Sequence, residues 1–127
     1  MGRILIIDDD ETFSSFLAAS IRESYKLLQV AVCSDPRKSL QMIQNGGFDL
    51  LLIDLEMPII DGAKIFKYAT DVGFNKNRIV ILSGHDADYL HEHFPLGTCL
   101  AVLNKYEAKQ KAVLDMIFTS LQKKAAG

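Results

Sequence analysis

Short runs of apolar residues recur along the chain, and each is separated from the next by a segment with a different hydrophobic period. The runs at residues 3–7, 48–53 and 78–82 contain almost nothing but apolar side chains, which is typical of strands buried on both faces. Two further runs, at 27–33 and 99–103, are also strand-like. The pattern therefore predicts strands at these positions.

The segments between the predicted strands have the spacing of amphipathic helices. In the first, apolar residues recur at Phe13, Phe16, Leu17 and Ile21. A second helix is predicted to start at 34–36, where a capping residue precedes proline, and to stop at 45–47. A third is predicted to open at 61–62, and a short fourth covers 87–94, before Pro95 and Gly97.

The last predicted helix has the clearest apolar stripe. Its members are Val113, Leu114, Ile117, Phe118 and Leu121. Strands that alternate with helices through short connections predict an α/β fold, in which a parallel sheet carries helices on both faces. We expect one doubly wound domain over 1–127, with 124–127 as a tail or the start of a linker.

Composition narrows the class of protein. The 127 residues are 49% hydrophobic with a net charge of −2, which argues against disorder and against direct nucleic-acid binding. Cys33 and Cys99 are the two cysteines, so we expect buried, reduced thiols of a cytosolic protein. No apolar run approaches the roughly 20 residues that span a bilayer, and no signal-peptide pattern precedes the first strand.

Polar side chains stand where the predicted strands end. Asp8 and Asp9 follow the first, Asp54 the third, Ser83 the fourth and Lys105 the fifth. In doubly wound sheets, ligands bind beyond the carboxyl ends of the strands. We therefore expect three carboxylates, one hydroxyl and one ammonium to converge on one crevice.

Such a cluster suits phosphoryl transfer. Crowded carboxylates resist ionisation unless a cation neutralises them, and Mg²⁺ prefers carboxylates, waters and phosphate oxygens. With the metal bound, one aspartate can attack phosphorus and form an aspartyl phosphate. Lys105 and the Ser83 hydroxyl would then stabilise the charge on the transferring group.

The sequence around these residues resembles the receiver domain of response regulators in bacterial two-component signal transduction, of the chemotaxis-regulator type. Ile53-Asp54-Leu55-Glu56-Met57-Pro58-Ile59-Ile60-Asp61-Gly62 is similar to the family's acceptor strand and following loop, and 4–10 is similar to its acidic first strand. The resemblance runs from Arg3 to about Leu121. It implies a flavodoxin-like (βα)5 fold with strand order 2-1-3-4-5.

The resemblance also implies a role for each site residue. Asp54 would accept the phosphoryl group, and Asp8 and Asp9 would hold Mg²⁺, helped by Asp54 and the backbone carbonyl of Glu56. Ser83 would be the switch hydroxyl and Lys105 the lysine that pairs with the phosphoryl group. The protein would then be a regulator more than an enzyme, although it would hydrolyse its own phosphate.

The same resemblance implies partners for the chain. A sensor histidine kinase or a histidine phosphotransfer protein would donate the phosphoryl group. A downstream effector would read the switched surface, and the face of the last two helices could form a homodimer. Neither nucleic acid nor a membrane is an expected partner of this domain.

The chain departs from the family pattern at Tyr106, where proline usually follows the lysine, and at Val102, which replaces an aromatic residue that moves on phosphorylation. Phosphorylation should survive both departures, whereas coupling to the output face is open. Glu56 and His85 flank the path of attacking water, so they either tune the lifetime of the phosphoryl group or are simply exposed.

Two other hypotheses stay open. Asp8-Asp9-Asp10-Glu11-Thr12 also fits the nucleophile motif of haloacid-dehalogenase-type phosphohydrolases, with Asp8 as nucleophile, but the acidic motif expected after the lysine is missing. Alternatively, the chain is a receiver-like docking module that is never phosphorylated. His91 and His93 are two residues apart and would point to different faces of a helix, so no metal site is expected there.

Overall fold

A computed structural model describes residues 2–127, without the side chain of Ala87. Strands and helices alternate along the chain, as the sequence pattern predicts. In chain order the elements are β1 (Gly2–Ile7), α1 (Glu11–Ser24), β2 (Leu28–Cys33), α2 (Pro36–Asn45), β3 (Leu50–Asp54), α3 (Gly62–Asp71), the 3₁₀ turn η1 (Lys76–Arg78), β4 (Ile79–Ser83), α4 (Ala87–His93), β5 (Ala101–Asn104) and α5 (Lys109–Ala126).

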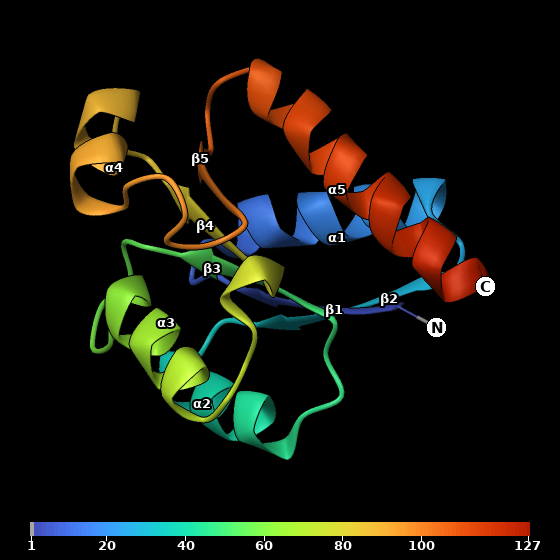
Figure 1. The fold of residues 1–127 in the computed structure, drawn as a ribbon, viewed down its shortest axis with the longest axis horizontal. Coiled ribbons are helices and arrows are strands. Elements are labelled where there is room, and N and C mark those ends of the chain that lie inside the picture. The colour runs from blue at the N-terminus through green and yellow to red at the C-terminus, as the bar shows by residue number, and fades with distance from the viewer. Residues whose placement is uncertain (1) are drawn as a thin grey trace.

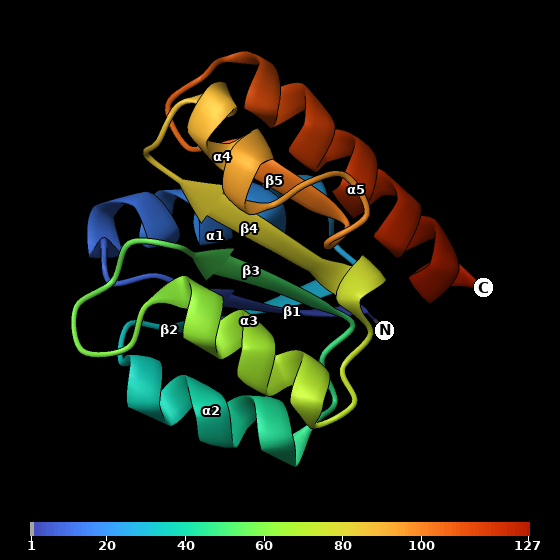
Figure 2. The same ribbon diagram turned by 60° about the vertical axis from the view of Figure 1, so that its left-hand side comes forward.

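The strands form one five-stranded parallel sheet in the order β2-β1-β3-β4-β5. This confirms the predicted doubly wound, flavodoxin-like fold. Helices α2 and α3 lie against one face of the sheet, and α1 and α5 lie against the other (Figures 1 and 2). The sheet is thus covered on both sides, which is why its strands read as continuous apolar runs.

Successive residues of each central strand supply opposite cores. In β1, for example, Leu5 and Ile7 pack with α2, α3 and α4, whereas Ile4 and Ile6 pack with α1 and α5. All four are fully buried. The apolar stripe predicted for the last helix also faces the core, with Phe118 at its centre.

Four helices begin at an aspartate whose side chain accepts a hydrogen bond from the first turn. These N-caps are Asp10, Asp35, Asp61 and Asp86. Each satisfies a backbone N–H that the helix itself cannot, which stabilises a helix by about 1 kcal/mol. Asp10, the third residue of the acidic triplet, is therefore the N-cap of α1, whereas Asp8 and Asp9 do not cap this helix.

Four predicted strand starts were too early, and for three of them, β3, β4 and β5, the structure shows the local cause. β3 begins at Leu50 because the Asp49 carboxylate accepts from the Arg3 backbone N–H, at 2.9 Å. β4 begins at Ile79 because the preceding residues form the η1 turn. A turn also precedes β5, and in this turn the Thr98 N–H donates to the Pro95 carbonyl. The strand therefore starts only at Ala101.

Smaller differences concern the chain ends, β2 and the cysteines. The predicted tail at 124–127 is mostly helical because α5 continues to Ala126. β2 starts at Leu28, one residue later than predicted, and β1 at Gly2, one earlier. Both cysteines are free, but Cys99 is only partly buried. Burial raises the pKa of both thiols. Among residues 2–127, no helix has the length and apolar character needed to cross a bilayer.

Gly62 is fixed by close packing against the backbone that carries Asp54. A Cβ at this position would overlap the Asp54 carbonyl oxygen and lie 2.7 Å from the Leu55 Cα. Both obstacles are backbone atoms of a buried strand end, so neither can move aside easily.

We expect Gly62→Ala to lower the free energy of unfolding by about 2–3 kcal/mol, as overpacking of a rigid site does. Urea unfolding would measure this. Gly84→Ala is the matched control, since its Cβ would meet only atoms of exposed side chains, the Tyr106 ring at 3.3 Å and Glu56 Oε1 at 3.6 Å, and no backbone. Equal urea midpoints for the two variants would contradict the close-packing argument.

Candidate functional site

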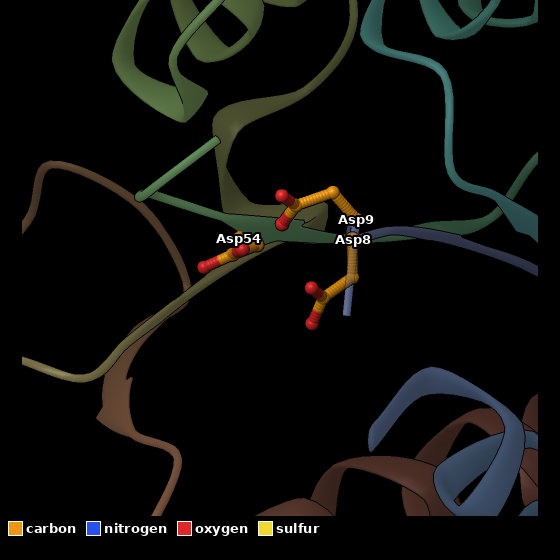
Figure 3. Close-up of side chains that lie close together, drawn as sticks. All are labelled: Asp8, Asp9 and Asp54. Carbon is orange, nitrogen blue, oxygen red and sulfur yellow. The ribbon is translucent and has the colours of Figure 1, made fainter. Parts of the chain in front are cut away.

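The carboxyl ends of four strands bring the predicted site residues together. Asp54 and Ser83 are the last residues of β3 and β4, and Asp8 and Lys105 directly follow β1 and β5. Carboxylate oxygens of Asp8, Asp9 and Asp54 lie within 4.8 Å of one another (Figure 3).

The register of the sheet explains this convergence. Ile7 pairs with Ile53, so Asp8 and Asp54 stand side by side at the ends of β1 and β3. Asp54 in turn pairs with Leu82, which places Ser83 one residue beyond it. The Lys105 backbone N–H donates to the Ser83 carbonyl at 2.8 Å, which brings the end of β5 to the same edge.

Lys105 joins the two buried carboxylates. Its Nζ lies 2.8 Å from Asp8 Oδ2 and 3.4 Å from Asp54 Oδ1, and all three side chains are at most 5% exposed. The ammonium also lies 4.7 Å from the centre of the Phe13 ring, a favourable cation–π contact. The ammonium is therefore held beside the carboxylates rather than in solvent.

Burial and charge shift the ionisation of this group. Burial, followed by the neighbouring Asp8 carboxylate, raises the pKa of Asp54 to about 8, against the opposing effect of Lys105. For Lys105, burial alone would lower the pKa, but the contacts with Asp8 and Asp54 outweigh it and the pKa is raised. One ammonium is thus not enough to keep both buried carboxyl groups ionised near neutral pH.

The cluster fits a hard divalent cation. Three carboxylates supply oxygen ligands, and the Lys105 ammonium, 2.8 Å from Asp8 Oδ2, is the one cation found beside that oxygen among the described residues. Such a donor set favours Mg²⁺ over zinc. The Glu56 backbone N–H donates to Asp54 Oδ1 at 3.2 Å, so the peptide of Glu56 lies beside the Asp54 carboxylate. Its carbonyl as a metal ligand stays a prediction.

Ser83 is hydrogen-bonded to a side chain whose position the sequence did not predict. Its hydroxyl donates to Glu56 Oε2 at 2.7 Å, and the Gly84 N–H donates to Glu56 Oε1, also at 2.7 Å. The backbone N–H of His85 donates to Ser83 Oγ at 3.0 Å. The Glu56 side chain thus contacts the Ser83 hydroxyl directly, the group that the sequence predicts as the switch hydroxyl.

Asn104 is a second feature that sequence reasoning missed. Its Nδ2 donates to the His85 carbonyl at 2.7 Å, and its Oδ1 accepts from the Tyr106 N–H at 2.7 Å. It therefore ties the loop after β4 to the loop after β5. The available signal was an amide at the end of a strand, directly before Lys105.

The two departures from the family pattern have different surroundings. Val102 is half-buried and packs against the core on the side of α2, α3 and α4. Tyr106 is 73% exposed, with its ring close to Gly84.

Histidines do not join the site's metal cluster. The rings of His85, in the loop before α4, and of His93, at the end of α4, both stack on Tyr89, with centroids 3.9 and 4.1 Å from its ring. Within the described part of the chain, the acidic triad is the one group found with metal-binding geometry.

Fold and site together define a doubly wound domain with an acidic cation pocket at the carboxyl edge of its sheet. Comparison with known proteins specifies the class further. Residues 4–118 match the family model of the response regulator receiver domain. The chain belongs to this family.

Relatives and solved structures agree with that assignment. A response regulator receiver protein of Anaeromyxobacter sp. (strain Fw109-5) is 31% identical over 116 residues, which cover 91% of this chain and 47% of that protein. The receiver domain of a Francisella response regulator superposes with a TM-score of 0.79 at 22% identity, covering 98% of both chains. The Thermotoga maritima response regulator TrrA, in complex with Mg²⁺ and BeF, gives 0.77 at 20%, covering 95% of this chain and 99% of its own.

The chain spans less than half the length of the relatives it matches. It covers 47% of the Anaeromyxobacter protein and 16% of the Arabidopsis thaliana two-component response regulator ARR11, which is 29% identical over 68% of this chain. Receiver domains bind Mg²⁺ at an acidic pocket, and Asp8, Asp9 and Asp54 form such a pocket here.

The raised pKa of Asp54 predicts a pH-dependent stability in metal-free buffer. The folded value of about 8 lies above the roughly 3.9 of an unfolded aspartate, so between these values the folded chain binds a proton that the unfolded chain lacks. This contribution is present at low pH and is lost as the pH rises through 8.

We therefore expect the free energy of unfolding to fall from pH 5 to pH 9 more steeply in the wild type than in Asp54→Asn. Urea unfolding of both proteins with a chelator present would measure the difference. Parallel pH profiles would show that Asp54 ionises as it does in the unfolded chain.

Proposed function

We propose that the chain accepts a phosphoryl group on Asp54 in a Mg²⁺-dependent reaction and so switches a surface that a partner reads. One observation carries this proposal: three carboxylates and a buried lysine ammonium converge on one end of the sheet. A solvated acidic loop would not explain why Lys105 is buried there.

In the proposed reaction, an Asp54 carboxylate oxygen forms a bond to phosphorus while the P–N bond of a phosphohistidine breaks. The leaving imidazole nitrogen keeps the electron pair of that bond. Bound Mg²⁺, held by Asp8, Asp9, Asp54 and the Glu56 carbonyl, would neutralise the carboxylates and polarise the phosphoryl oxygens.

The protein's own donors supply the remaining stabilisation. Lys105 can pair with a phosphoryl oxygen, since its ammonium already lies 3.4 Å from Asp54 Oδ1. Ser83, at the end of the neighbouring strand, can donate its hydroxyl to another oxygen. Donors placed close to the reacting group in this way stabilise the charge that develops in the transition state.

Family membership supports the choice of partners. We propose a histidine kinase or histidine phosphotransfer protein as donor, and an effector domain or protein as reader. A homodimer through α4 and α5 and a cytoplasmic location belong to the same proposal, as does a regulatory rather than an enzymatic role.

Asp54→Asn should abolish Mg²⁺-dependent phosphorylation by acetyl phosphate, because the amide cannot attack phosphorus. Intact-protein mass spectrometry would follow the 80 Da adduct, the mass that a phosphoryl group adds. Asp71→Asn is the matched control, since Asp71 is an exposed residue at the end of α3.

The same experiment separates the competing hypotheses. Labelling that survives Asp54→Asn but is lost in Asp8→Asn would favour the phosphohydrolase mechanism. If neither acetyl phosphate nor beryllofluoride produced any Mg²⁺-dependent change near Ser83, the chain would be a docking module.

Lys105→Ala should slow phosphorylation by about 100-fold, the typical cost of one lost charge-stabilising donor. Mg²⁺ should bind several-fold more tightly, because the variant removes a competing positive charge from the carboxylates. Calorimetric titration suits the Mg²⁺ measurement, since the chain has no Trp. Lys105→Arg, which keeps the charge, is the control. Weaker Mg²⁺ binding in Lys105→Ala would contradict this account of the cluster.

A further inference from the structure

The Glu56 carboxylate holds two hydrogen-bond donors, one with each oxygen. The Ser83 hydroxyl and the Gly84 N–H each donate to it at 2.7 Å. Hydrogen bonds to a charged acceptor are shorter and about twice as strong as neutral ones. The Glu56 carboxylate is therefore firmly hydrogen-bonded to both donors.

Neither donor has a second hydrogen to offer. Ser83 Oγ accepts from the His85 N–H at 3.0 Å, and its own proton is committed to Glu56. A backbone amide such as Gly84 carries a single N–H. With Glu56 in place, another anion cannot use either donor.

These donors stand where an acceptor on Asp54 needs them. Asp54 pairs with Leu82, so Ser83 and Gly84 come next along the neighbouring strand. A phosphoryl group on Asp54 would present anionic oxygens to this hydroxyl and amide. A carboxylate, with two oxygens sharing one negative charge, resembles two of those oxygens.

We infer that Glu56 is a built-in competitor for the phosphoryl-oxygen site: its carboxylate occupies the Ser83 and Gly84 donors and must leave before Asp54 can be phosphorylated. The inference rests on the proposed function, since it assumes that Asp54 is the acceptor. It assigns Glu56 a direct part in setting how readily the chain responds to a phosphoryl donor.

The surroundings of Glu56 allow such an exchange. Residue 56 is exposed, whereas Leu55 and Met57 on either side are buried, so the side chain can swing into solvent while the backbone stays fixed. Across the described residues, no lysine or arginine forms a salt bridge with Glu56. When the Glu56 side chain moves away from Ser83 and Gly84, it therefore loses two hydrogen bonds and no ion pair.

The test measures beryllofluoride binding at saturating Mg²⁺, followed by the Gly84 amide in NMR spectra. Glu56→Gln keeps the size of the side chain but loses one acceptor oxygen. Glu56→Asp keeps the charge but is one methylene too short to span both donors from a fixed backbone. Glu23→Gln, at the far end of α1, removes one exposed acidic charge as a control.

We expect beryllofluoride to bind both Glu56 variants about tenfold more tightly than the wild type, because a competing state that is roughly 90% occupied weakens apparent affinity by that factor. Phosphorylation by phosphoramidate should speed up in parallel, and Glu23→Gln should match the wild type. In the ligand-free protein, the Gly84 amide proton should shift upfield in both Glu56 variants.

Three outcomes would overturn the inference. If Glu56→Gln bound more tightly while Glu56→Asp matched the wild type, charge alone would explain the effect. Equal affinities in all chains, with binding still dependent on Asp54, would remove the competitor and leave the proposed function standing. If no chain bound beryllofluoride or accepted a phosphoryl group, the proposed function would fail, and the inference with it.

Discussion

The contact of Lys105 with the carboxylates of Asp8 and Asp54 organises the carboxyl edge of the sheet. All three side chains are nearly inaccessible to water. Taking an ion out of water costs several kcal/mol unless partners replace the lost solvation. One ammonium cannot do this for two carboxylates and the nearby Asp9. The sheet therefore ends in more carboxyl groups than one lysine can keep ionised, and such a cluster favours the binding of a cation.

The fold and most of the site residues could be predicted from the sequence because two physical patterns coincide. Strands buried on both faces read as apolar runs, and a parallel sheet brings their carboxyl ends to one edge. The first charged or hydroxylic residue after such a run must then lie at that edge. Asp8, Asp54 and Ser83 follow this rule directly, and Lys105 follows it with one residue, Asn104, between it and the last apolar position.

The loops could not be predicted in the same way, because their contacts join residues far apart in the chain. Glu56 meets Ser83 and Gly84 across 27 and 28 positions. Asn104 reaches back 19 positions to the His85 carbonyl. No local period encodes such pairs, since they depend on how two loops leave adjacent strands. The start of β3 was mispredicted for a related reason: Asp49 is fixed by a hydrogen bond to β1, which its own sequence neighbours do not reveal.

The site contains carboxylates that attract a cation and hydrogen-bond donors that attract an anion. In the folded chain, the protein's own side chains already contact both sets of groups. Lys105 stands in part for a metal among the carboxylates, and Glu56 takes the donors that would bind an anion. Buried polar groups are rarely left unpaired, so a site without these stand-ins would be less stable. Each of these two side chains must nevertheless bind more weakly than the group that it stands in for, which is the metal for Lys105 and the phosphoryl group for Glu56. Otherwise neither group could bind to the site. Glu56 satisfies this condition because it is exposed and held by two neutral donors. The readiness of Asp54 to react is then set by how firmly the neighbouring loop holds a side chain that takes no part in the chemistry.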